Sequence, residues 1–97
     1  MTKKFETRAI RTQIERSKYS EHSSPLYLTS SFVFDTAEDM SAAFTEEENK
    51  TNIYSRFTNP NTTEFIQKIT QMEGAEDGVA FASGMGAIYS TFAALLK

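Results

Sequence analysis

The spacing of apolar and polar positions predicts four helices along this chain. The first covers residues 5–17, where a narrow apolar stripe runs between charged side chains. The second begins after Thr36, which can cap a helix and is followed by acids that suit a first turn. It places Ala37, Met40 and Phe44 on one face. Both helices are therefore expected to be amphipathic.

The two later helices are more strongly marked. One starts at a cap supplied by Asn61, Thr62 or Thr63 and ends before Gly74, which suits the left-handed residue after a helix. The other follows Ser83 directly and is apolar almost all round. A helix of that kind requires burial on two sides.

Between the helices the sequence predicts loops and two extended segments. Residues 17–25 form a polar loop, and residues 45–52 form an acidic one. Residues 26–34 are rich in Tyr, Thr, Phe and Val, and residues 79–82 form a short apolar run typical of a buried strand. A buried strand that leads straight into a helix is half of a parallel crossover. We therefore expect an α/β fold and interpret the chain as the opening piece of a larger protein.

Composition narrows the function classes. The 97 residues are 39% hydrophobic and 24% charged, as in a folded domain, and no apolar run is long enough to span a membrane. The formal net charge of -3 argues against a nucleic-acid surface. With no cysteine, disulfides and thiol catalysis are excluded. The first residues lack the apolar stretch of a secretion signal, so we expect a cytoplasmic location.

The first candidate site is the turn between the predicted strand and the last helix. Ser83, Gly84, Met85 and Gly86 form it, and the free N–H groups at a helix start can bind a phosphate that glycine lets approach. A plain tight turn is the alternative. The dinucleotide fingerprint is not matched because Tyr89 replaces its third glycine, and the lysine of a P-loop is absent.

The second candidate is the pair of Tyr54 and Arg56. In an extended backbone, side chains two residues apart point the same way, and a phenol beside a guanidinium suits one oxyanion. The alternative is a surface loop in which Arg56 pairs with a carboxylate. His22 has no second ligand at metal spacing, and residues 46–48 are best explained as a solvated acidic turn, so no metal site is expected.

Taken together, these segments resemble the pyridoxal-phosphate enzymes of cysteine and methionine metabolism, the cystathionine γ-synthase family. The resemblance is carried by residues 54–60 and 83–88, with support from residues 72–76 and 26–32. It extends from about Thr7 to the end of the chain and covers only the opening part of such an enzyme.

The resemblance implies a fold-type-I architecture, a mixed sheet covered by helices. Residues 1–60 would be an N-terminal arm with subunit contacts, and residues 61–97 the start of the α/β domain that binds pyridoxal 5'-phosphate. The backbone N–H groups of Gly84 and Met85 would hold the cofactor phosphate. Tyr54 and Arg56 would reach the phosphate of the neighbouring subunit's cofactor, so that a complete site requires a dimer.

The family's activity would be γ-replacement on an amino-acid substrate. O-succinylhomoserine and sulfide would give homocysteine, a step of transsulfuration and methionine biosynthesis, in a homotetramer built as a dimer of dimers. A γ-synthase, an acetylhomoserine sulfhydrylase or a γ-lyase of the same family remain alternatives. A phosphate- or partner-binding module is the alternative outside enzymes. No nucleic-acid or membrane partner is expected.

The resemblance also shows what this stretch does not supply. The family's Schiff-base lysine, and its other residues around the cofactor ring, would lie beyond Lys97, and none of the lysines present matches it. We therefore assign no catalytic residue and expect the 97-residue chain alone to be inactive. Where the family usually has Asn-Pro-Thr, this chain has Asn59, Pro60 and Asn61, a change from which we expect little consequence.

Overall fold

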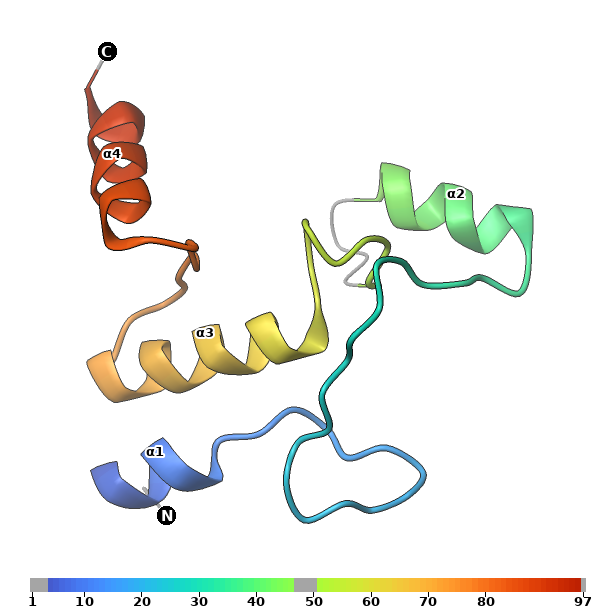
Figure 1. Cartoon of the computed structure of the whole chain (residues 1–97), viewed down its shortest axis with the longest axis horizontal. Helices are drawn as coiled ribbons and strands as arrows, with labels where there is room; N and C mark the ends of the chain where they lie inside the picture. Colours follow the sequence, from blue (N-terminus) through green and yellow to red (C-terminus); the bar gives the residue numbers. More distant parts are fainter. Residues whose placement is uncertain (1–3, 47–50, 97) are drawn as a thin grey trace. The chain divides into compact units, whose positions relative to one another are not determined.

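The computed structural model describes residues 4–46 and 51–96, and within them the chain forms four helices (Figure 1). They are α1 (Phe5–Arg11), α2 (Ala37–Thr45), α3 (Pro60–Glu73) and α4 (Gly84–Leu95). Half of the acidic loop predicted over residues 45–52, namely residues 47–50, lies outside the described residues. None of the described helices is long and apolar enough to cross a membrane.

The chain divides into two compact units. One contains residues 13–64, and the other joins residues 1–12 to residues 65–97. In the second unit α1 lies beside the C-terminal half of α3, where Arg8 Nη1 donates to the Gln71 carbonyl at 2.9 Å (Figure 1). The Thr12 hydroxyl donates to Gln71 Oε1 at 3.0 Å. These bonds attach the N-terminal helix to a segment about sixty residues away in sequence.

Helix α1 is shorter than predicted. It ends at Arg11, and Thr12 has an extended backbone with φ -71° and ψ 112°. A helix continuing to residue 17 would need the Ile14 N–H to bond within the helix. That N–H instead donates to a carboxylate oxygen of Glu64, at 3.2 Å. The prediction over residues 12–17 was wrong because a distant acceptor replaces the local one.

The loop that follows is held by its own polar groups. Glu21 accepts from the Ser17 N–H at 2.9 Å and from the Ser17 hydroxyl at 2.7 Å, and Arg16 Nε donates to the Glu21 carbonyl at 2.8 Å. The bonds from Ser17 stabilise the carboxylate and lower the pKa of Glu21 below its usual value. Ser20 has φ 52°, so the loop turns through a left-handed residue there. The predicted polar loop is confirmed.

Helix α2 begins as the sequence predicts. The Thr36 side chain accepts from the Asp39 N–H at 3.0 Å, the bond expected of an N-cap. Ala43 is buried, whereas Met40 and Phe44 on the predicted apolar face are exposed. The local signal for the helix start is correct, but the described residues do not cover the helix's apolar face.

The start of α3 differs from the prediction. Pro60 is its first residue, and the Asn59 carbonyl accepts the first helical bond, from the Thr63 N–H at 3.0 Å. Asn59 Oδ1 accepts from the Asn61 N–H at 2.9 Å. Asn59 is therefore the N-cap, and Pro60 occupies the first helical position, where its missing N–H costs nothing. The expected caps at positions 61–63 lie inside the helix.

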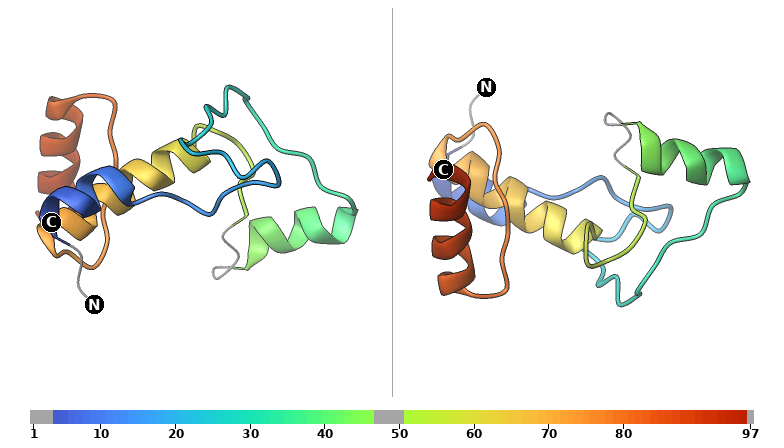
Figure 2. Two further views of the ribbon diagram at one scale, coloured as in Figure 1. Left: turned by 90° about the horizontal axis from the view of Figure 1, so that it is seen from below. Right: turned by 90° about the horizontal axis from the view of Figure 1, so that it is seen from above.

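The end of α3 is confirmed. Gly74 has φ 67°, and the Ala75 N–H donates to the Thr70 carbonyl at 2.9 Å. This bond across a left-handed glycine is the Schellman arrangement, which satisfies a carbonyl of the last turn. After Gly74 the chain turns and crosses α3 on its way to α4 (Figure 2), and a Cβ on Gly78 would lie 3.0 Å from a methyl group of Thr70.

The predicted strand at residues 79–82 was wrong. The described residues contain no strand, and their one β-bridge is an isolated antiparallel contact between Ser31 and Tyr54. Val79 and Phe81 are exposed. A strand exists only where another strand accepts and donates its ladder bonds, and none lies beside this segment in the described residues. The mixed sheet of the expected α/β class is thus not seen in the described residues.

Helix α4 starts and ends close to where the sequence predicts. Its apolar side chains are exposed on several sides, including Met85, Ile88 and Phe92. The burial on two sides that its composition requires is not supplied by the described residues.

The left-handed position after α3 provides a test of this local structure. Replacing Gly74 with alanine should make hydrogen exchange over residues 70–75 faster by about fivefold, because a Cβ at positive φ costs about 1 kcal/mol. No atom lies within 4 Å of the new Cβ, so backbone strain alone is measured. Gly74→Asn is the control, since asparagine tolerates this conformation better. Equal exchange in Gly74→Ala and the parent chain would contradict the assignment.

Candidate functional site

The first part of the site is the start of α4. Ser83 has an extended backbone, and its hydroxyl oxygen accepts from the Gly86 N–H at 3.0 Å. Its carbonyl accepts from the Ala87 N–H at 3.1 Å. Two earlier amides, those of Gly84 and Met85, have no hydrogen-bond acceptor within residues 4–46 and 51–96. The Ser83 side chain therefore provides an acceptor for the Gly86 N–H but none for the N–H groups of Gly84 and Met85, which can bind a ligand.

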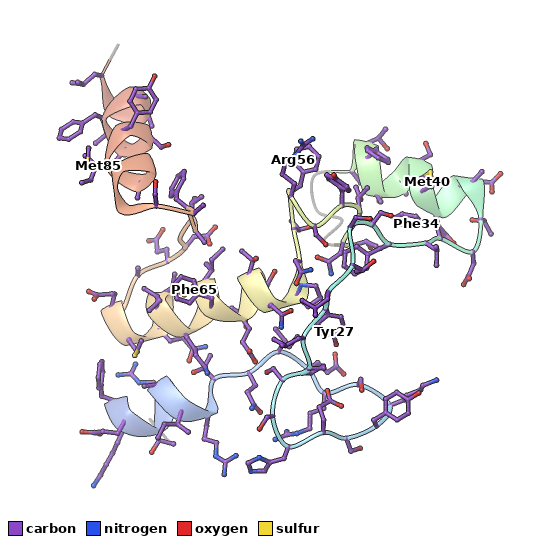
Figure 3. The ribbon with its side chains drawn as sticks, viewed as in Figure 1. Tyr27, Phe34, Met40, Arg56, Phe65 and Met85 are labelled. Atoms are coloured by element: carbon purple, nitrogen blue, oxygen red, sulfur yellow. The ribbon has the colours of Figure 1, made fainter. Side chains whose placement is uncertain are left out.

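The surroundings of these amides favour a negatively charged ligand. The aligned peptides of α4 place partial positive charge at this end, and its first turn holds no acidic side chain. A Cβ on Gly84 would find nothing within 4 Å, so a ligand can approach the backbone closely. Met85 is exposed, as its labelled side chain on α4 shows in Figure 3. This geometry can bind an anion such as a phosphate.

The second part is the turn that carries Tyr54 and Arg56. The sequence-based expectation of an extended backbone was wrong, because the N–H groups of Phe57 and Thr58 donate to the Tyr54 carbonyl at 2.9 and 3.0 Å. These bonds curl the chain into a turn. The Arg56 guanidinium carbon then lies 5.2 Å from the ring centroid of Tyr54 and 5.3 Å from that of Phe57.

Arg56 is thus stacked on two rings instead of paired with an acid. No carboxylate in the described part of the chain forms an ion pair with it, so the surface ion-pair alternative is not what the structure shows there. The attraction of a cation to ring faces orients the guanidinium. Its planar set of N–H donors, on an exposed side chain, suits a bidentate oxyanion.

A neighbouring segment fixes the first residues of this turn. The Phe32 N–H donates to the Ile53 carbonyl at 3.0 Å, and the Ser55 N–H donates to the Ser30 carbonyl at 2.8 Å. These bonds flank the bridge between Ser31 and Tyr54. The Tyr54 backbone is therefore held on both sides before the turn begins.

The two parts of the site belong to different compact units. Tyr54 and Arg56 lie in the unit of residues 13–64, whereas Gly84 and Met85 lie in the other. Each pair is by itself a candidate for binding an anion. Elsewhere, no group of His, Asp and Glu side chains in the described residues could hold a metal ion, and His22 Nδ1 lies 3.4 Å from the Ser23 hydroxyl.

The hydrogen bonds that three polar side chains make to distant segments were not predicted from the sequence. Asn59, Asn61 and Glu64 lie at the start of α3 and bond to groups more than thirty residues earlier in the chain. Only the Asn-Pro pair gave a local signal, since proline is common at the first position of a helix and asparagine at its cap.

Comparison with known proteins gives a consistent result. A family model described as "Cys/Met metabolism PLP-dependent enzyme" matches residues 6–97. An O-succinylhomoserine sulfhydrylase of Pseudomonas aeruginosa is 48% identical over 84 residues, covering 87% of this chain and 21% of that protein. An L-methionine gamma-lyase of Fusobacterium nucleatum is 43% identical over 91 residues, covering 94% of this chain and 23% of that protein.

A more distant relative has the same name as the first. The O-succinylhomoserine sulfhydrylase of Mycobacterium tuberculosis is 34% identical over 90 residues, covering 93% of this chain and 22% of that protein. The chain therefore spans between a fifth and a quarter of the length of the curated relatives it matches.

Proposed function

The chain belongs to the family of pyridoxal-phosphate-dependent enzymes of cysteine and methionine metabolism, and on this premise we propose that its residues hold the cofactor phosphate in a γ-replacement enzyme. The observation that supports this most directly is the pair of amides of Gly84 and Met85 that lack an acceptor in the described residues. Phosphate is the anionic group of the family's cofactor.

The residues at the start of α4 fit that phosphate. Two N–H groups, the positive end of a twelve-residue helix and the open space beside Gly84 meet the requirements of a dianionic group near the backbone. Ser83 contributes indirectly, because its hydroxyl is engaged by the Gly86 N–H and fixes the first turn. In the proposed site Gly84 and Met85 bind the phosphate, and Ser83 holds the helix start in place.

Tyr54 and Arg56 complete the phosphate site in the proposal. Arg56 supplies charge and a fork of donors, and Tyr54 supplies a phenol together with the ring on which the guanidinium rests. We propose that this pair reaches the phosphate held by a second copy of the chain. Its stacked geometry supports this role, because the guanidinium is oriented before the anion arrives.

For the whole protein we propose γ-replacement on O-succinylhomoserine with sulfide. The bond between the γ-carbon and oxygen breaks, succinate leaves, and a carbon–sulfur bond forms to give homocysteine. The cofactor, when bound, supplies an electron sink for this chemistry. The 48% identity to an O-succinylhomoserine sulfhydrylase favours this substrate. The proposal includes a cytoplasmic homotetramer of fold type I, with residues 61–97 beginning the cofactor domain.

Methionine γ-lyase activity is the second candidate. An L-methionine gamma-lyase aligned over 94% of this chain is 43% identical to it, a value close to that of the sulfhydrylase. None of the residues described above contacts an amino-acid substrate in the proposal. The two activities therefore share this phosphate site and differ elsewhere in the whole protein.

Replacing Gly84 with proline in the whole protein tests the backbone donors. Proline is favourable at the first helical position, and Ser83 already has the extended backbone that precedes proline. Helix α4 should persist while one N–H is lost, which should weaken binding of pyridoxal phosphate by about tenfold or more. Gly84→Ala retains the N–H and is the control. Equal cofactor dissociation constants for the proline variant and the control would contradict the backbone site.

Replacing Arg56 separates its charge from its planar fork. Arg56→Ala should speed the release of pyridoxal phosphate by about tenfold or more, and Arg56→Lys should restore only part of the retention, because lysine provides a point charge without the fork. Tyr54→Phe keeps the ring under Arg56 and removes only the hydroxyl, so a smaller loss is expected. Release can be followed by dialysis and absorbance. Unchanged retention in Arg56→Ala would remove this residue from the site.

The proposed reaction is tested by supplying both candidate substrates to the purified whole protein. With O-succinylhomoserine and sulfide we expect stoichiometric homocysteine and succinate, at a kcat/KM at least about tenfold above that for release of methanethiol from methionine. The reverse preference would assign the protein to the γ-lyases. Turnover of neither substrate by a protein that retains its cofactor would contradict both assignments.

A further inference from the structure

Asn59 is the one buried polar residue in the described chain, with 8% of its surface exposed. Both the oxygen and the nitrogen of its side-chain amide form hydrogen bonds. Oδ1 accepts from the Asn61 N–H at 2.9 Å, while Nδ2 donates to the Tyr27 carbonyl at 3.0 Å and to the Ser55 hydroxyl at 3.1 Å. A primary amide has two N–H donors, so its donor capacity is filled. With these three hydrogen bonds formed, the Asn59 side chain fixes the segments that it joins.

The bond to Ser55 reaches the phosphate-binding turn itself. Ser55 stands between Tyr54 and Arg56, and its hydroxyl donates to the Thr29 carbonyl while accepting from Asn59. A continuous chain of hydrogen bonds therefore runs from the cap of α3, through Ser55, to the backbone at Thr29. Ser55 lies between Tyr54 and Arg56 in the sequence, and it cannot shift without breaking these hydrogen bonds.

We propose that Asn59 is a positioning residue for phosphate binding by Tyr54 and Arg56. Its buried amide holds Ser55 against the segment of residues 27–30, and so sets the direction in which the stacked guanidinium points. In Figure 3 the labelled Tyr27 lies beside the first turn of α3, which Asn59 caps. The inference rests on the phosphate-binding role proposed above for Tyr54 and Arg56.

The competing explanation is that Asn59 serves only as the cap of α3. Asn59→Ser distinguishes the two roles. Serine is as good a cap as asparagine, so the acceptor for the Asn61 N–H is kept. Its hydroxyl is too short to replace the amide that spans Tyr27 and Ser55, so those bonds are lost.

Asn61→Ala is the matched control, because Asn61 joins the same two elements without touching the turn. Its Oδ1 accepts from the Tyr27 N–H and its Nδ2 donates to the Pro25 carbonyl, each at 2.8 Å. Alanine removes both bonds and loosens the extended segment from α3. It leaves the link between Asn59 and Ser55 in place, so it measures loosening of the segment alone.

The experiment measures the dissociation constant and release rate of pyridoxal phosphate in the whole protein, for each variant alone and in an Arg56→Ala background. Asn59→Ser should weaken binding by about tenfold, and Asn61→Ala by less than about twofold. In the Arg56→Ala background Asn59→Ser should add only a small further loss, through Tyr54, because the charged residue that it positions is gone. A merely structural role would give the same loss in both backgrounds.

The outcomes separate this inference from the proposed function. If Arg56→Ala weakens binding but Asn59→Ser does not, the positioning role is overturned and the phosphate site stands. If Arg56→Ala has no effect, the positioning role of Asn59 and the phosphate-binding role of Arg56 both fall, whereas the backbone site at Gly84 and Met85 is tested separately by Gly84→Pro. An equal loss from Asn59→Ser in the two backgrounds also overturns the positioning role. Ser55→Ala breaks the same hydrogen-bond chain from an unburied position, and it provides the same test if Asn59→Ser fails to fold.

Discussion

Three segments of the unit of residues 13–64 are joined by the hydrogen bonds of the buried Asn59 amide. One residue starts α3, fastens the extended segment at Tyr27 and holds the Tyr54–Arg56 turn at Ser55. The unit has almost no apolar core, since Ala43 is its one buried hydrophobic residue among those described. Directional polar bonds, rather than side-chain packing, therefore determine where its side chains point.

In the unit of residues 1–12 and 65–97, the candidate binding groups belong to the backbone. Ser83 caps α4 through Gly86 and leaves the first amides of the helix without an acceptor in the described residues. Peptide N–H groups cannot move independently of the helix, so a site built from them is already formed before a ligand binds. In the proposed function, these backbone donors and the Arg56 guanidinium of a second copy of the chain bind the same phosphate.

The elements that were predictable from sequence are those whose signal is local. Thr36, Gly74 and Ser83 act within four or five residues of themselves, and each appears in its expected role. The errors involve distant partners. Helix α1 stops early because Glu64 binds the Ile14 N–H, and the segment of residues 79–82 forms no strand because a strand needs a neighbour.

In the candidate site, too, the features that depend on local sequence could be predicted, and those that depend on distant partners could not. The free amides of Gly84 and Met85 could be predicted, because they depend only on where a helix starts. The turn that stacks Arg56 on Tyr54 was expected to be extended, since no glycine or proline between them signals it. The role of Asn59 was not predicted because its partner Tyr27 is 32 positions away, a relation that one sequence does not reveal.

In the proposed function, Tyr54 and Arg56 of one subunit bind the phosphate that is held by Gly84 and Met85 of another. Mixing whole-protein Arg56→Ala subunits with Gly84→Pro subunits tests it directly, with bound pyridoxal phosphate counted per subunit. In a mixed pair, one site would combine an intact Gly84 with an intact Arg56 from the neighbour. If two subunits share each phosphate site, tight binding should return at about half the sites of such pairs. No recovery on mixing would show that each subunit builds its phosphate site alone, and would overturn the shared site.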